Sequence, residues 1–236
     1  MKKGFLKHYR FLKRLPPKGD VFFGVGGLYS LDMASRRRGI KQIYLFDCSL
    51  KVAAFWSHIL PILRTHPRRF EALAEMNRVI EENPDWFSTR KGPCALQTHS
   101  NQLIRWVESG HSFLSEDRFY QKIHDLARRA QIVFQRADLS DPDSSNAIYK
   151  YFLNKTVDTF YLSNISTCLP KKSEREVVRV LMERVRWAHG AYLVLVNGES
   201  FEQWVIGEMS FEAPFKIAVL AAAVFVVAST VFYQIL

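Results

Sequence analysis

One stretch near the N-terminus limits the possible fold more than any other feature: an apolar segment, a glycine-rich turn, a helix and a second apolar segment. VFFGVGG, residues 21–27, is typical of a buried strand that ends in glycines, and residues 28–39 are typical of a helix closed by Gly39. QIYLFD, residues 42–47, is a second apolar strand that ends on an acid. This order is the usual opening unit of a doubly wound α/β sheet.

The rest of the chain extends this α/β pattern and interrupts it once. A helix over 50–64 carries apolar residues on one face, and residues 67–130 are predicted to be helical in at least three pieces. That length exceeds what one crossover needs, so we expect an inserted helical subdomain. Further strands are predicted at 131–138, 157–165 and 190–198, with a short helix near 146–153 and an amphipathic helix over 173–188. We therefore predict a doubly wound, mostly parallel sheet of Rossmann-like type.

Three glycines and one acid stand where such a sheet binds nucleotides. Gly24, Gly26 and Gly27 lie where the first strand meets the first helix, whose N-terminus offers unpaired N–H donors. Asp47 ends the second strand, where an acid can accept hydrogen bonds from ribose hydroxyls. Either feature alone also suits a tight turn, but together they indicate a site for a ribose nucleotide.

The segments GVGG, FDCS, RADLSD and LSNIS make the chain resemble the class I S-adenosylmethionine-dependent methyltransferases over about residues 20–198. The resemblance implies a methyltransferase-like fold in which Gly24 and Gly26 form the cofactor loop and Asp47 is the ribose ligand. It also implies that Asp138, just past the third strand, meets the adenine amine. Asn164, past the fourth strand, would face the reacting sulfonium and the acceptor, as the catalytic residue.

Two departures from that family pattern keep a non-catalytic role open. The acid that family members carry two residues before the first glycine is Phe22 here, and their third glycine is Leu28. A scaffold that keeps the fold and binds lipid or protein is therefore the alternative to an enzyme. A dinucleotide site is disfavoured by Tyr29, where GxGxxG requires glycine, and no GK[ST] follows to make a P-loop.

The SNIS segment, residues 163–166, supports a further alternative. It resembles enzymes that move the aminocarboxypropyl group of S-adenosylmethionine onto diacylglycerol in betaine-lipid synthesis. Those enzymes also carry a long helical insert after the second strand, and their substrate lies in a membrane. The same Asn164 also suits a simple turn at a strand end.

The C-terminal residues form an apolar run, 217–236, without a charge inside it. At about 1.5 Å of rise per residue, a helix of this length spans the roughly 30 Å hydrocarbon core of a bilayer. Nothing soluble follows it, so we predict a tail anchor over 215–236 and an α/β domain over 20–212. The alternative is a buried core helix of a globular fold. The run is apolar on every face, which argues against that alternative.

The first 19 residues form a basic arm with interleaved apolar and aromatic side chains, and they contribute much of the net charge of +10. Such an arm suits the anionic headgroups of a membrane surface, although a lead-in helix packed on the domain explains it equally well. No apolar core of a secretory signal follows the lysines. The basic flank of the anchor predicts a single-pass membrane protein whose bulk faces the cytoplasm.

The cysteines and histidines indicate neither a disulfide framework nor a metal site. Cys48, Cys94 and Cys168 are odd in number and widely spaced, which fits a reducing compartment. The seven histidines form no HxH or HxxxH pair, so we expect no metal. Arginine clusters occur without a recognised nucleic-acid module, and we expect no nucleic-acid partner.

Overall fold

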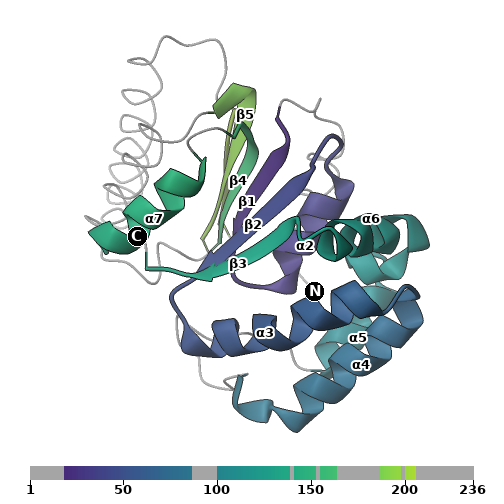
Figure 1. Cartoon of the computed structure of the whole chain (residues 1–236). Coiled ribbons are helices and arrows are strands. Elements are labelled where there is room, and N and C mark those ends of the chain that lie inside the picture. The colour runs from purple at the N-terminus through teal and green to yellow at the C-terminus, as the bar shows by residue number, and fades with distance from the viewer. Residues whose placement is uncertain are drawn as a thin grey trace, which may run out of the picture.

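The computed structural model describes residues 19–86, 100–138, 141–152, 155–163, 187–197 and 200–205. Its centre is a six-stranded sheet in the order β3-β2-β1-β4-β5-β6 (Figure 1). The strands are β1 (Val21–Val25), β2 (Gln42–Asp47), β3 (Ile132–Arg136), β4 (Val157–Ser163), β5 (Trp187–Asn197) and β6 (Ser200–Val205). The first five strands run parallel, and β6 pairs antiparallel with β5. This order is that of a Rossmann-like sheet.

Helices cover both faces of the sheet, unequally. The helices are α2 (Leu28–Arg36), α3 (Leu50–Thr65), α4 (Arg69–Glu82), α5 (Ser100–Glu108), α6 (Asp117–Arg128) and α7 (Pro142–Phe152), with short 3-10 turns η1 (Pro84–Trp86) and η2 (Phe113–Ser115). Figure 1 shows α2 to α6 gathered on one side of the sheet and α7 on the other. The main apolar core lies between the sheet and the larger group of helices.

The central strands are buried because their side chains pack on both faces. In β2, Ile43 and Leu45 join the main core, while Tyr44 and Phe46 point to the opposite face. There, Phe23 of β1 stacks on both Tyr44 and Phe46, with ring centroids 5.4 and 4.7 Å apart. A continuous apolar run in the sequence is what a strand packed on both faces requires.

The chain between β2 and β3 consists of helices that pack around α2 and α3. His124 of α6 contacts the carbonyl oxygen of Leu63 in α3 at 2.8 Å, and the Tyr120 hydroxyl donates to the carbonyl of His66. The inserted helices therefore share one core with the sheet rather than forming a core of their own.

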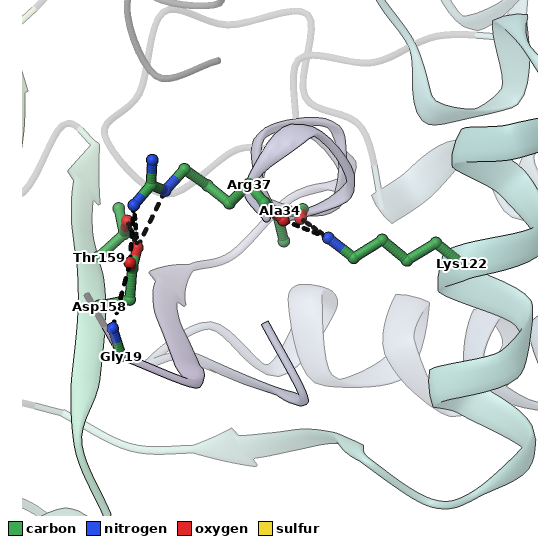
Figure 2. A network of polar contacts seen from close by, with 6 residues as sticks. All are labelled: Gly19, Ala34, Arg37, Lys122, Asp158 and Thr159. Carbon is green, nitrogen blue, oxygen red and sulfur yellow. Dashed lines mark hydrogen bonds and ion pairs between the residues drawn. The ribbon is translucent and has the colours of Figure 1, made fainter. Parts of the chain in front are cut away.

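A buried polar network joins the end of α2 to β4 and α6 (Figure 2). The Arg37 guanidinium donates to both carboxylate oxygens of Asp158, from Nε at 2.9 Å and from Nη2 at 2.6 and 2.7 Å. Neither side chain has exposed surface. The Lys122 ammonium donates to the carbonyls of Ala34 at 2.9 Å and of Arg37, at the negative end of α2. Burial and the neighbouring charge of Arg37 together lower the pKa of Lys122 to about 8, although the Asp158 carboxylate raises it in part.

The structure corrects one predicted helix end and adds one strand, and the two segments predicted to contact a membrane fall almost wholly outside the described residues. Trp187 and Ala188, predicted to end a helix, begin β5, where Trp187 pairs with Val157. The edge strand β6 was not predicted, because its mixed sequence SFEQWV gives no clear apolar alternation. Within the described residues every helix is too short or too polar to cross a membrane. The predicted anchor at 215–236, like all but the last residue of the arm at 1–19, lies outside the described residues.

Candidate functional site

The glycine turn between β1 and α2 is held in place from two neighbouring elements. Gly26 has φ +50°, a backbone conformation that residues other than glycine rarely adopt. Its N–H donates to the carbonyl of Phe46 in β2 at 2.9 Å. The indole Nε1–H of Trp56, in α3, donates to its carbonyl oxygen. Both backbone groups of Gly26 are therefore bound by the protein itself, which fixes the path of the turn.

Asp47 lies directly over this turn. A Cβ added to Gly26 would stand 2.6 Å from Oδ2 of Asp47, so any side chain at this position would require the carboxylate to move. The other oxygen, Oδ1, accepts the N–H of Ser49 at 2.9 Å. Partial burial raises the pKa of Asp47 above its ordinary value, and hydrogen bonds from the N–H groups of Ser49 and Cys48 offset only part of this rise. The fold thus brings together two residues predicted for the site, Gly26 and Asp47.

Gly27 and the first turn of α2 complete the backbone part of the site. Gly27 is the N-cap residue of α2, and its backbone is extended. No side chain caps this end of α2, and its first turn carries no acid. The positive end of the α2 dipole therefore points toward the glycine turn, and no acidic residue in the first turn of α2 neutralises it.

Gly24 serves packing between β1 and α2. A Cβ at this position would lie 2.8 Å from Oγ of Ser30 and 2.9 Å from the Phe22 ring. The Ser30 hydroxyl donates to the carbonyl of Val25 at 2.7 Å, which ties the start of α2 back to the strand. Gly24 was predicted as part of a cofactor loop, and the contacts present here are those of close helix–strand approach.

The two remaining predicted residues differ in what can be said of them. Asp138 follows β3 at the same edge of the sheet as Asp47, and its side chain is exposed. The adjacent N–H of Ala137 donates to the carbonyl of Asp47 at 2.9 Å, so the chain around Asp138 runs beside the end of β2. Asn164 lies outside the described residues, immediately after β4.

Sequence reasoning missed two side chains at this edge. Trp56 belongs to the helix predicted over 50–64 with an apolar face, but its indole N–H also holds the glycine turn. Arg136 pairs in register with Asp47, and its Nε donates to the carbonyl of Cys48 at 3.2 Å. A basic residue two positions before the expected strand-end acid Asp138, in RAD, was the available signal for Arg136.

The position of Phe22 marks the clearest departure from the methyltransferase pattern. Its side chain is fully buried in the main core, where the family pattern expects an acid near the cofactor. Across the described parts of the chain, His, Cys, Asp and Glu side chains nowhere gather in threes that could hold a metal ion.

Taken together, the strand order and the glycine turn define a protein of the Rossmann-like α/β class. Within this class, the chain belongs to a family described as a domain of unknown function (DUF7790), whose model matches residues 6–177. Among solved structures, the chain is similar to the rRNA methyltransferase aviRa from Streptomyces viridochromogenes. The two are 15% identical with a TM-score of 0.41, over 81% of this chain and 70% of that one. No curated protein matches the chain.

Proposed function

We propose that this domain binds S-adenosylmethionine at the glycine turn and transfers a methyl or related group from it to an acceptor. The observation that carries the proposal is the Asp47 carboxylate lying over the Gly26 turn. In Rossmann-like sheets an acid at the end of the second strand accepts hydrogen bonds from the two ribose hydroxyls. The sulfonium of the bound cofactor would supply an activated alkyl group.

The residues present fit the nucleoside part of this cofactor. Gly26 has no side chain, so its turn leaves the Asp47 carboxylate in place and lets a ligand approach the backbone. One carboxylate oxygen is oriented by Ser49, which fixes the plane in which the other can accept a hydrogen bond. Asp138 would meet the adenine amine, and Asn164 would face the acceptor. The protein's contribution to transfer would be proximity and orientation.

A second candidate function is a scaffold without catalysis. Phe22 favours it, because a fully buried phenylalanine offers no charge to the cofactor where the family carries an acid. Such a protein would keep the fold and bind lipid or another protein. The two candidates differ in one measurable property, since only the enzyme must bind an adenosyl ligand.

Replacing Asp47 tests the proposed site. In Asp47→Ala, ribose hydroxyls would lose a charge-assisted acceptor, so we expect the affinity for S-adenosylhomocysteine to fall by about 1.5–3 kcal/mol, roughly 10- to 150-fold. Isothermal titration calorimetry of the full-length protein in detergent measures this change. The fold should survive, because the Asp47 side chain is only partly buried at the open end of a strand.

Asp85→Ala, which removes an exposed acid on η1, is the matched control and should bind like wild type. Wild-type protein that binds no adenosyl ligand at millimolar concentration would exclude the enzyme and favour the scaffold. Binding that is the same in Asp47→Ala and wild type would mean that the ligand lies elsewhere.

We also propose that the apolar run at 217–236 anchors the chain in a membrane, with the α/β domain facing the cytoplasm. Full-length protein should then sediment with membranes and resist carbonate extraction. A chain ending at Glu212 should lose that resistance, because about 20 apolar residues are needed to span the bilayer. Salt-sensitive binding left in the shortened chain would be assigned to the basic arm. Full-length protein released by carbonate would contradict the anchor.

A further inference from the structure

A buried carboxyl group links helix α2 to the inserted helices. Asp32, in the middle of α2, has no exposed surface. Its Oδ2 accepts the indole N–H of Trp106 in α5 at 2.7 Å, and its Oδ1 accepts the backbone N–H of Phe113 in η2 at 2.6 Å. One side chain of the sheet-bound helix thus binds two separate points of residues 100–115.

The segment held by Asp32 lies beside the glycine turn. The Trp106 ring packs against Tyr29, the second residue of α2, with centroids 6.1 Å apart. Tyr29 in turn packs on Tyr161 of β4, whose backbone pairs with that of Gly24. The His111 ring also packs on Trp106, with centroids 5.4 Å apart. A shift of residues 100–115 would therefore move the aromatic side chains next to the proposed cofactor site.

We infer that Asp32 is a positioning residue whose buried carboxyl group docks residues 100–115 on α2 and thereby sets the place of the Trp106 ring against Tyr29, at the start of α2. Its effect on ligand binding rests on the proposed function. The docking itself does not, because the contacts exist within the protein alone.

The protonation state of Asp32 makes the docking depend on pH. Burial raises the pKa of Asp32, and the net value is about 7. Hydrogen bonds from Trp106, Phe113 and Ser112 and the charge of Arg36 act in the opposite direction. If residues 100–115 leave α2, Asp32 meets water and its pKa returns toward about 3.9. The docked state then binds more protons than the undocked state, so rising pH weakens docking up to about pH 7 and has little further effect above it.

The other charged groups around α2 do not reproduce this profile. Arg36 donates to the carbonyls of Gly110 at 3.1 Å and Ser112 at 3.4 Å, and its charge is constant over this range. Lys122 of α6 binds the far end of α2, and its pKa of about 8 places its titration above that of Asp32. His111 contacts Trp106 and the Ser109 hydroxyl, so a variant of Asp32 is needed to separate the two groups.

Hydrogen exchange of the ligand-free, full-length protein tests the inference. The readout is the protection of amides in 100–115 relative to those of β2, corrected for chemical exchange, from pH 5 to 8. In wild type we expect local opening to increase roughly 10- to 100-fold between pH 5 and 7 and then level off. Asp32→Asn should show no such dependence, while Glu108→Gln, which neutralises an exposed acid of α5, should keep it.

Trp106→Phe provides a second test that does not require Asp32 to be changed. It removes a donor that favours the charged carboxylate, so the levelling-off should move to higher pH. A wild-type profile that is flat, or one that Asp32→Asn leaves unchanged, would overturn the inference. The expected profile in a protein that binds no adenosyl ligand would uphold the docking role while rejecting the proposed function.

Discussion

Asp158→Ala is expected to lower the free energy of unfolding by about 3–5 kcal/mol, because it leaves the Arg37 charge buried without its partner. Both side chains lack exposed surface, and the guanidinium makes its bonds to the carboxylate at 2.6–2.9 Å. The Thr159 hydroxyl and the N–H of Gly19 also lose their acceptor. Urea unfolding followed by circular dichroism measures the change.

Two further variants separate the buried pair from a general effect of removing an acid. Asp117→Ala breaks the pair with Arg69 at 2.6 Å, in which Asp117 is 85% exposed, and should cost no more than about 1 kcal/mol. The double variant Arg37→Met with Asp158→Leu replaces both charges with apolar groups. It should be more stable than Asp158→Ala, since no unpaired charge remains. Equal losses in Asp158→Ala and Asp117→Ala would contradict the assigned role of the buried pair.

Trp56→Ala is expected to cost about 3–5 kcal/mol of stability and to weaken binding at the glycine turn. The Trp56 ring is fully buried, where it stacks on Phe134 at 6.1 Å and meets Phe55 edge-on at 5.6 Å. Its loss opens a cavity in the main core and removes the donor to the Gly26 carbonyl. Thermal unfolding and titration with S-adenosylhomocysteine measure the two effects.

The variant Trp56→Phe separates the contribution of ring packing from that of the hydrogen bond to the Gly26 carbonyl. The phenylalanine ring fills part of the core but leaves the buried carbonyl of Gly26 without its donor, at a cost of about 1–3 kcal/mol. We expect Trp56→Phe to be intermediate in stability and to have reduced ligand affinity. Ligand affinity equal to that of wild type would show that the indole N–H does not position the turn.

The sequence alone determined the opening of the fold and where a ligand site should be sought. Strands predicted over 21–27 and 42–47 are observed as β1 and β2, and the helix predicted over 50–64 is observed as α3. These elements follow from local patterns of apolar residues, glycines and caps, which a linear chain displays directly. Gly26 and Asp47 could be singled out for the same reason, because each stands at the end of a predicted strand.

Only the tertiary structure decided which distant residues meet. Arg37 and Asp158 are 121 positions apart, and Asp32 and Trp106 are 74 apart. The local sequence predicts neither contact, because a charged or indole side chain at such a position could equally well be exposed to solvent. The sheet order places β4 beside β1 and packs the inserted helices on α2, and burial then requires each polar group to find a partner. That requirement, which acts between elements rather than within them, produced the contacts that the sequence did not display.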